Sequence, residues 1–363
     1  MPTAASQVTA ISLIEQDSER VVSEVGDSIH RLCGKTLLLT GANGFLASYL
    51  VDTVAWMNQH VFSSPCRLIA MVRSPITPSE RLGHLLGRGD VQFIQQDVCA
   101  PVHLDGPINF VVHAASKASP KDYLAHPLET MDANVIGTRL LLDLVKAQRT
   151  GRVLFLSSGE IYGNVSAQFI PIQEDCPWSM PPTDPRACYA ESKRYGEALC
   201  LAYWREYQVP VNIARTFHVY GPGLRLDDGR VMADFFRHRL ENTPLRVLSD
   251  GSGVRAFCYV SDAVTGFLKL LLSDCHGEVV NIGNDQEPLS VRELALLIAT
   301  LEDPQLPVKF QSVALPEHLR GSPSQVCPDI SKARRLLHFE PRVGLREGLC
   351  KTLQWHRACL GRR

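Results

Sequence analysis

Residues 36–47, TLLLTGANGFLA, decide the fold of this chain. A short apolar run typical of a buried strand leads into a glycine-rich turn, and a helical stretch follows through Trp56. Gly41 permits the tight turn, Gly44 lets the backbone approach a pyrophosphate, and Ala47 takes the third small position, where helix meets strand. The free N–H groups and the dipole of the helix would then face the phosphates of a dinucleotide. A tight strand-to-helix turn that holds no ligand is the alternative.

The alternation of strand and helix continues beyond this turn. A helical stretch covers residues 134–146, and further apolar runs of strand length occur at residues 67–72, 91–94, 108–113, 153–156 and 211–214. Short, unbroken apolar strands that alternate with helices indicate a parallel sheet covered on both faces. The sequence therefore predicts an α/β fold with a doubly wound parallel Rossmann sheet.

The pattern loosens near residue 221. Beyond it, polar loops, a helix near residues 232–240 and short strands predict a smaller α/β C-terminal domain. We expect a helical extension at residues 1–33, a mainly NAD(P)-binding Rossmann domain at 34–220, and a mainly substrate-binding, partly interleaved domain at 221–363.

The segment before the first strand has apolar residues at roughly helical spacing: Ile11, Ile14, Val21, Val22, Val25, Ile29 and Leu32. This spacing predicts an amphipathic helix that packs on the domain or on a partner subunit. A solvated, partly disordered arm is the alternative.

The composition is that of an ordinary globular protein, with 45% hydrophobic and 21% charged residues and a net charge of −1. Without a basic field, nucleic-acid binding is not expected. No apolar run approaches the roughly 20 residues of a membrane span, and the first ten residues lack the features of a signal peptide. The eleven cysteines include no C-x-x-C pair, so we expect no metal site and no disulfide framework, but the reduced thiols of a cytoplasmic protein.

Residues 189–193, YAESK, place Tyr189 and Lys193 four residues apart and hence on one face of a helix. A phenol with a pKa of about 10 is a poor base at neutral pH. A nearby ammonium and the charge of an oxidised nicotinamide would lower that pKa by stabilising the phenolate. Tyr189 could then take a proton from a substrate hydroxyl, and Lys193 could also bond the nicotinamide ribose. An ordinary pair of surface side chains is the alternative.

A second group of polar residues, SSGEIYG at residues 157–163, ends a predicted strand about 30 residues upstream of Tyr189. The hydroxyl of Ser158 can bond the same substrate oxygen as Tyr189. The strand end, the Tyr-Lys pair and the glycine-rich turn together indicate a dinucleotide-dependent enzyme.

The ends of the second and third predicted strands bear on the choice between NAD and NADP. An acid after the second strand would bond the ribose 2′-OH and repel a 2′-phosphate. Arg73 follows that strand instead, and it could pair with the 2′-phosphate of NADP or be a solvated loop charge. Asp97 could accept a bond from the adenine amino group or be a simple turn acid.

From residue 34 to about residue 355, the chain resembles the extended short-chain dehydrogenase/reductase family of nucleotide-sugar epimerases, dehydratases and decarboxylases. Beyond the three features above, the resemblance rests on His113-Ala114-Ala115-Ser116, Asn134-x-x-Gly137-Thr138, Arg215-x-x-x-x-Tyr220-Gly221-Pro222, Arg255-x-Phe257-x-Tyr259-Val260-x-Asp262 and Asn281-Ile282-Gly283. Within the family it is most similar to the UDP-glucuronate decarboxylases (UDP-xylose synthases), through DPRACY at residues 184–189, DGRV at 228–231 and PDISKA at 328–333.

The resemblance implies chemistry through transient oxidation at C4 of a nucleotide sugar, with a UDP-sugar favoured. Tyr189 and Ser158 would act on the C4 hydroxyl while the C4 hydride passes to a tightly bound NAD, with NADP as the alternative cofactor. The 4-ketone would acidify C5 or let a C6 carboxylate leave as CO2 before the hydride returns. The family also implies a homodimer through two helices of the Rossmann domain.

Candidate site residues follow from the resemblance. The catalytic residues would be Tyr189, Lys193, Ser158 and Glu160. The cofactor would lie against Gly41, Asn43, Gly44, Phe45, Leu46, Arg73, Asp97, Val98, Ala114, Ala115, Ser116, Asn134, Tyr189 and Lys193. The substrate would meet Arg230 and Arg255 at its diphosphate, since a planar guanidinium suits phosphate. Lys117 and Tyr123 would line the sugar pocket, and His218 would contact either the phosphate or the sugar. Each arginine could instead be a solvated charge.

Two departures from the family pattern bear on the reaction. The 4,6-dehydratases have an acid and the decarboxylases usually a serine where this chain has Gly159, so dehydration is less expected and decarboxylation less firmly indicated. Glu160 could act as a base at C5 or as a hydrogen-bond partner of other site residues. His218 stands where many relatives have asparagine, and it could contact substrate or be a core histidine.

We therefore rank decarboxylase and 4-epimerase close together, ahead of 4,6-dehydratase. An NADPH-dependent 4-keto-sugar reductase and a noncatalytic dinucleotide-sensing module are further alternatives.

Overall fold

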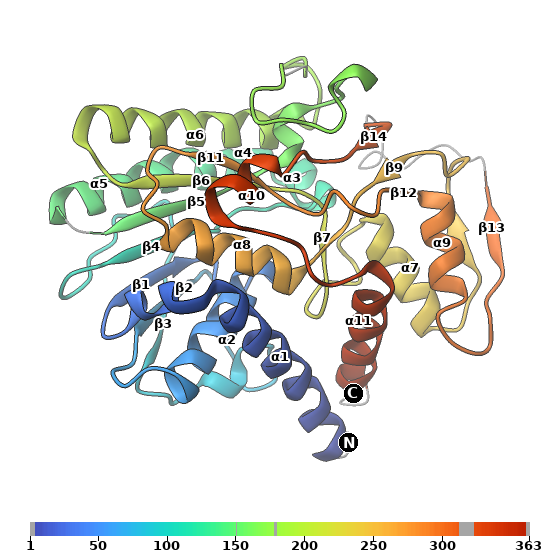
Figure 1. Ribbon diagram of the computed structural model, residues 1–363, viewed down its shortest axis with the longest axis horizontal. Coiled ribbons are helices and arrows are strands. Elements are labelled where there is room, and N and C mark those ends of the chain that lie inside the picture. The colour runs from blue at the N-terminus through green and yellow to red at the C-terminus, as the bar shows by residue number, and fades with distance from the viewer. Residues whose placement is uncertain (1–3, 150, 178–179, 312–322, 361–363) are drawn as a thin grey trace.

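A seven-stranded parallel sheet forms the centre of the molecule (Figure 1). The computed structural model describes residues 4–149, 151–177, 180–311 and 323–360. The strands of the sheet are β1 (Thr36–Thr40), β2 (Arg67–Val72), β3 (Val91–Gln95), β4 (Phe110–His113), β5 (Arg152–Ser158), β6 (Val211–Thr216) and β11 (Val279–Ile282). Their spatial order is β3-β2-β1-β4-β5-β6-β11, with every neighbouring pair parallel. The predicted doubly wound α/β fold is confirmed.

Helices cover both faces of this sheet (Figure 1). On one face lie α2 (Phe45–His60) and α8 (Val260–Leu272), and on the other α5 (Thr138–Gln148) and α6 (Ala187–Tyr207). Successive side chains of a strand point to opposite faces, so Leu37 and Leu39 of β1 join one core and Leu38 joins the other. This two-sided burial explains why the strands are unbroken apolar runs.

The remaining helices, short strands and turns lie outside the seven-stranded sheet. The helices are α1 (Ala4–Val25), α3 (Pro120–Ala125), α4 (Pro127–Asp132), α7 (Val231–Leu240), α9 (Val291–Ala299), α10 (Ser331–Leu337) and α11 (Leu345–Leu360). The short strands are β7 (Val219–Tyr220), β8 (Leu245–Val247), β9 (Val254–Arg255), β10 (Cys258–Tyr259), β12 (Leu289–Ser290), β13 (Val308–Phe310) and β14 (Gln325–Val326). Short 3₁₀ or π turns are η1 (Gly26–Leu32), η2 (Gly83–Leu85), η3 (Ala133–Gly137), η4 (Gly159–Tyr162) and η5 (Ala167–Phe169). Within the described ranges, no helix is long and apolar enough to cross a membrane.

The C-terminal third of the chain contributes to two layers. Helices α7 and α9 pack with the β8–β13 pair in a smaller part beside the sheet (Figure 1). In contrast, α8 and β11 return to the sheet, where β11 pairs with β6. The chain therefore crosses repeatedly between the two parts.

Helix α1 packs on α2, α8 and α11 of the same chain rather than extending as a solvated arm. Its buried Asp17 carboxylate accepts hydrogen bonds from the hydroxyls of Tyr49 and Tyr259, both at 2.7 Å, and from Nζ of Lys351 at 3.1 Å. These partners lie on α2, β10 and α11, so one side chain ties the N-terminal helix to three segments.

Replacing Asp17 with alanine is expected to lower the free energy of unfolding by about 2–3 kcal/mol, because two buried hydroxyls lose their acceptor. Lys351 would keep its ion pair with Glu347, at 3.4 Å, which limits the loss of stability. Urea unfolding measures the change. Glu15→Ala, at an exposed position of the same helix, is the control and should change stability by about 0.5 kcal/mol or less. Equal stability of the two variants would contradict this role of Asp17.

Candidate active site

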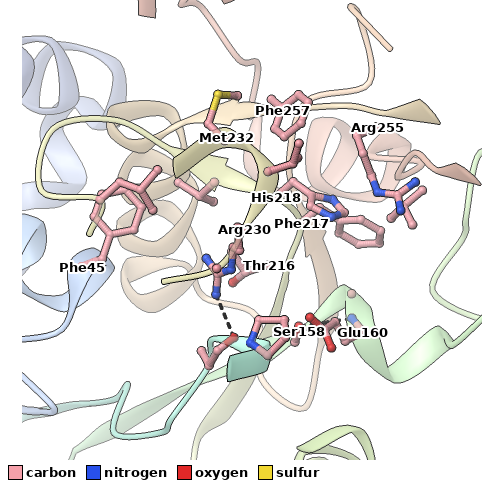
Figure 2. Close-up of a pocket in the computed structure, with 18 of the residues that line it drawn as sticks. Phe45, Ser158, Glu160, Thr216, Phe217, His218, Arg230, Met232, Arg255 and Phe257 are labelled. Atoms are coloured by element: carbon pink, nitrogen blue, oxygen red, sulfur yellow. Dashed lines mark hydrogen bonds between the residues drawn. The ribbon is translucent and has the colours of Figure 1, made fainter. Parts of the chain in front are cut away.

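A cavity of about 730 Å³ opens at the carboxyl ends of β1, β4, β5 and β6. Residues of α7 and β9 line its other side (Figure 2). Parallel α/β sheets bind ligands at this edge, where loops from several strands converge. The cavity collects most of the predicted catalytic and substrate residues: Ser158, Glu160, Tyr189, Lys193, His218, Arg230 and Arg255.

The glycine-rich turn after β1 has the shape needed to hold a dinucleotide. Gly41 has a φ of +67°, and a β-carbon there would lie 2.7 Å from Cα of Ala115. Gly44 is the N-cap of α2 and offers its first turn no side-chain hydrogen bond, so the N–H groups stay available to phosphates. At the cavity, the buried hydroxyl of Ser116 has no hydrogen-bond partner among the described residues. The turn and this free hydroxyl fit the predicted cofactor.

Other predicted cofactor residues divide between the cavity and its surroundings. Phe45, Leu46 and Ala114 line it, whereas Asn43 is exposed on the turn and is not part of the lining.

Two predicted ligand residues share one acid outside the cavity. Glu129 accepts a hydrogen bond from Arg73 at 3.0 Å, and Lys117 Nζ lies 3.4 Å from the same carboxylate oxygen. Neither basic residue lines the cavity. Arg73 therefore forms an exposed ion pair outside the cavity.

Three further predicted cofactor residues also lie outside the lining. Asp97 accepts a hydrogen bond from the backbone two residues later, and buried Val98 fills the space beside Gly137. Buried Asn134 donates to Ser192 on α6 at 2.9 Å, while its Oδ1 has no partner among the described residues. Asn134 thus fixes the helix that carries the Tyr-Lys pair.

The Tyr-Lys pair is buried on α6. Lys193 donates to the backbone oxygen of Leu156 at 2.7 Å, and its Nζ lies 5.9 Å from the ring centre of Tyr189. Burial raises the pKa of Tyr189 to about 12, and the negative charge of Glu160 acts in the same direction. Burial lowers the pKa of Lys193 to about 7, although Glu197 opposes that shift. The charge on Lys193 near neutral pH therefore depends on its neighbours.

The strand end after β5 forms a connected polar group with the Tyr-Lys helix. Ser158 Oγ accepts a hydrogen bond from the backbone N–H of Glu160 at 3.1 Å. The Glu160 carboxylate accepts from the hydroxyl of Tyr123 at 3.0 Å and from Arg186 at 3.1 Å. The ring of Tyr123 stacks on that of Tyr189, with centres 5.0 Å apart and planes 8° apart. Glu160 is thus fixed beside the predicted base.

Gly159 faces an aromatic ring instead of open space. A β-carbon at this position would lie 2.9 Å from the ring of buried Phe217. Serine or aspartate at this position would require the ring to move. The absence of a polar side chain at residue 159 is therefore built into the packing.

Five arginines line the cavity: Arg186, Arg230, Arg237, Arg246 and Arg255. Arg230 donates to the backbone oxygen of Ala118 at 2.7 Å (Figure 2), and Arg255 donates to backbone oxygens around residues 254 and 323. Burial, and then the charge of Arg186, lower the pKa of Arg255 to about 10. The imidazole Nδ1 of His218 is buried without a hydrogen-bond partner among the described residues. This concentration of positive charge suits a diphosphate.

The sequence profile of the NAD-dependent epimerase/dehydratase family matches residues 37–283. The chain belongs to this family. This confirms the resemblance drawn from its motifs, and NAD is the cofactor of the family.

Among curated relatives, this epimerase/dehydratase family member is 37% identical to UDP-glucuronic acid decarboxylase 1 of Danio rerio, over 88% of this chain and 72% of that one. It is 35% identical to UDP-glucuronic acid decarboxylase 6 of Arabidopsis thaliana, over 86% of each chain. Among solved structures, it resembles UDP-glucuronic acid 4-epimerase from Bacillus cereus in complex with UDP-glucuronic acid and NAD. The TM-score is 0.71 at 26% identity, over 89% of this chain and 99% of that one.

Arg186 is a cavity residue that was not among the predicted site residues. Arg186 lies in the DPRACY motif, lines the cavity and bonds Glu160. Its position directly before the Tyr-Lys helix was the available signal.

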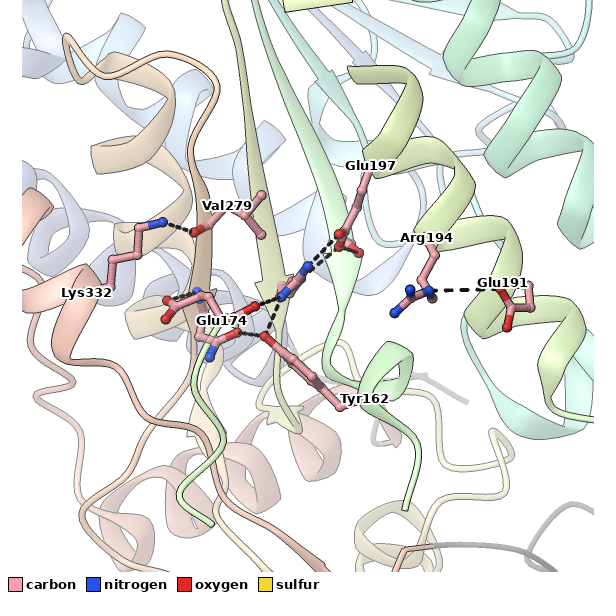
Figure 3. Close-up of polar contacts among 10 residues, drawn as sticks. Tyr162, Glu174, Glu191, Arg194, Glu197, Val279 and Lys332 are labelled. Atoms are coloured by element: carbon pink, nitrogen blue, oxygen red, sulfur yellow. Dashed lines mark hydrogen bonds and ion pairs between the residues drawn. The ribbon is translucent and has the colours of Figure 1, made fainter. Parts of the chain in front are cut away.

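A buried network behind the cavity was also missed (Figure 3). Arg215 on β6 donates two hydrogen bonds to the carboxylate of Glu197 at 3.0 and 2.8 Å, and a third to the hydroxyl of Tyr162 at 2.7 Å. Ser157 donates to the same carboxylate at 2.5 Å. Because Glu197 is one helical turn beyond Lys193, the network ties the catalytic helix to the strand end.

In this family member, Gly41→Ala is expected to weaken NAD binding about tenfold or more, because the new β-carbon strains a positive φ and displaces the backbone of Ala115. Calorimetric titration with NAD measures the change. Gly87→Ala is the matched control, because Gly87 also has a positive φ, +83°, but open space around it. Wild-type affinity in Gly41→Ala would contradict the assigned cofactor turn.

Proposed function

We propose that the chain is a UDP-glucuronate decarboxylase that works by transient oxidation at C4. The observation that carries this proposal is the similarity to proteins of that name over 88% of the chain. The cavity supports the proposal, because the Tyr-Lys pair that would act at C4 and a group of arginines line the same cavity. It also lacks an acid at Gly159, which an enzyme of the dehydratase kind would need there.

Each catalytic residue has a defined task in this proposal. NAD, when bound, accepts the C4 hydride and later returns it. Tyr189 takes the proton of the C4 hydroxyl, Ser158 holds the same oxygen, and Lys193 stabilises the phenolate by its charge. Glu160 holds Tyr123 by a hydrogen bond, and the stacked ring of Tyr123 orients the ring of Tyr189.

Carbon–carbon cleavage then follows from the ketone at C4. The electron pair left on C5 by departing CO2 can delocalise into that ketone, so the C5–C6 bond becomes weak. Arg230 and Arg255 hold the diphosphate, which fixes the sugar relative to Tyr189. His218 lines the cavity, whereas Lys117 and Tyr123 lie outside the lining.

A 4-epimerase of UDP-glucuronate is the second candidate, because the solved Bacillus cereus enzyme has this fold over 89% of the chain. A 4,6-dehydratase is disfavoured by Gly159 and its packing on Phe217. A reductase using NADPH is disfavoured because the chain belongs to the NAD-dependent epimerase/dehydratase family.

We also propose that the protein is a homodimer through α4 and α6. Four large apolar side chains on and next to these helices are exposed: Leu128, Met131, Ile136 and Tyr195. An exposed apolar group of this kind is typical of a subunit interface. Analytical ultracentrifugation should give twice the chain mass, and Leu128→Lys should give the monomer.

Two further proposals concern organisation and location. We propose an N-terminal helical extension at residues 1–33, a mainly NAD(P)-binding Rossmann domain at 34–220 and a mainly substrate-binding domain at 221–363, partly interleaved because β11 pairs with β6. The eleven cysteines are all free, which supports a reducing, cytoplasmic location.

The function is tested by incubating purified protein with UDP-, dTDP-, GDP- and CDP-sugars and recording product masses. We expect loss of one CO2 from UDP-glucuronate and no change in the neutral sugars. Loss of water would establish dehydration, and a change in chromatography without a change in mass would establish epimerisation. Cofactor binding without any conversion would indicate a sensing module.

A further inference from the structure

The proposed decarboxylation, on which this inference rests, requires a proton that the residues discussed so far do not supply. When CO2 leaves, the electron pair of the C5–C6 bond forms an enolate with the C4 ketone. C5 must then gain a proton to complete the pentose. Tyr189 is not available, because the proton it took from the C4 oxygen has to return there.

Few groups of the cavity can give a proton at neutral pH. The guanidiniums of Arg186, Arg230 and Arg255 hold their protons too tightly. The carboxylate of Glu160 is occupied as an acceptor for Tyr123 and Arg186. Lys193 is assigned to the phenolate and donates to the backbone oxygen of Leu156. Two imidazoles also line the cavity: that of His238 belongs to α7, whereas that of His218 follows β6, whose end is in register with Ser158.

The fold places His218 in the same cavity as the residues assigned to the oxidation. Ser158 at the end of β5 is in register with Thr216 at the end of β6. Thr216 and His218 both line the cavity, whereas Phe217 between them packs at Gly159. His218 therefore follows the strand end that pairs with the residue whose hydroxyl is assigned to C4, and C5 is bonded to C4.

The packing around His218 holds the ring in place but leaves a nitrogen free. Its ring meets that of Phe257 edge-on at 5.9 Å, and its backbone oxygen accepts a hydrogen bond from Cys258. Its Nδ1 is buried and has no hydrogen-bond partner among the described residues. A fixed imidazole with a free nitrogen is suited to proton transfer.

The charges that face His218 come from three separate segments. They are Arg186 before α6, Arg230 at the start of α7 and Arg255 in β9. Burial and these three guanidiniums hold the pKa of His218 well below its usual range. Glu160 partly balances Arg186 and Arg255. A substrate diphosphate and carboxylate would neutralise the guanidiniums, so they favour protonation of the ring.

We propose that His218 takes up a proton when the nucleotide sugar binds and donates it to C5 as CO2 leaves. The C5–C6 bond breaks and its electron pair enters the enolate. The N–H bond of the imidazolium breaks as the C5–H bond forms, which restores the C4 ketone. His218 is left neutral and receives its next proton from solvent when substrate binds again.

The test compares wild-type protein with His218→Asn in two measurements. Calorimetry of UDP binding in two neutral buffers of different ionisation enthalpy gives the protons taken up, and mass spectrometry gives the rate of UDP-xylose formation from UDP-glucuronate. The wild type should take up a fraction of a proton. The variant should take up no proton and should bind UDP with an affinity within about threefold of the wild type. Its rate of UDP-xylose formation should fall by about 10²-fold or more.

His276→Asn is the matched control, since His276 is partly buried against Trp204 and does not line the cavity. It should match the wild type in both measurements. Product formation by His218→Asn within about tenfold of the wild type would overturn the inference, as would unchanged proton uptake or loss of UDP binding. A wild type that releases no CO2 would contradict the proposed function and this inference together, whereas an active wild type beside an unimpaired variant would contradict the inference alone.

Discussion

Tyr189→Phe is expected to lower turnover of UDP-glucuronate by about 10²-fold or more, because the group proposed to take the C4 proton is removed. The stack on Tyr123 needs the ring and not the hydroxyl, so the fold and the cofactor site should persist. The measurement pairs the initial rate with the amount of NAD that remains bound to purified protein.

The matched control for this variant is Tyr207→Phe, an exposed tyrosine near the end of the same helix. It should keep the wild-type rate. A Tyr189→Phe protein that turns over within about threefold of the wild type would contradict the role of Tyr189 as general base.

Arg215→Met is expected to lower the free energy of unfolding by about 3–5 kcal/mol, because the carboxylate of Glu197 would stay buried without its ionic partner. The two side chains are only 12% and 8% exposed, so water replaces little of the lost interaction. The backbone oxygen of Glu174 and the hydroxyl of Tyr162 would lose a donor as well. Urea unfolding measures this change.

Arg225→Met provides the comparison, because Arg225 pairs with Asp227 while both side chains are about two-thirds exposed. An exposed pair of this kind contributes roughly 0–1 kcal/mol. If the two variants lost equal stability, the buried network would not be the tie between the catalytic helix and the strand end.

Much of the fold can be predicted from sequence because its signals are local. The run at residues 36–40 forms a strand buried on both faces, and the turn that follows it depends on residues adjacent in the chain. The attachment of α1 to the rest of the molecule depends instead on contacts between distant parts of the chain. Asp17 is a charged residue whose burial is explained by Lys351, 334 positions away, and no local pattern connects the two.

The site likewise combines features that are local in the sequence with contacts between distant residues. The spacing of Tyr189 and Lys193 on one helix is visible in the sequence. The contact of Phe217 with Gly159 and the bond between Arg186 and Glu160 arise where separate elements pack together. Sequence reasoning therefore identified the absence of an acid at residue 159, but not the ring that occupies its place.

The most direct test of transient C4 oxidation is the reaction of the protein with UDP-glucuronate that carries deuterium at C4. Mass spectrometry should show UDP-xylose, lighter than the substrate by one CO2, with the deuterium still present, because the same hydrogen leaves C4 and returns to it. A product that has lost CO2 and the deuterium, or a substrate that keeps its mass, would contradict the account.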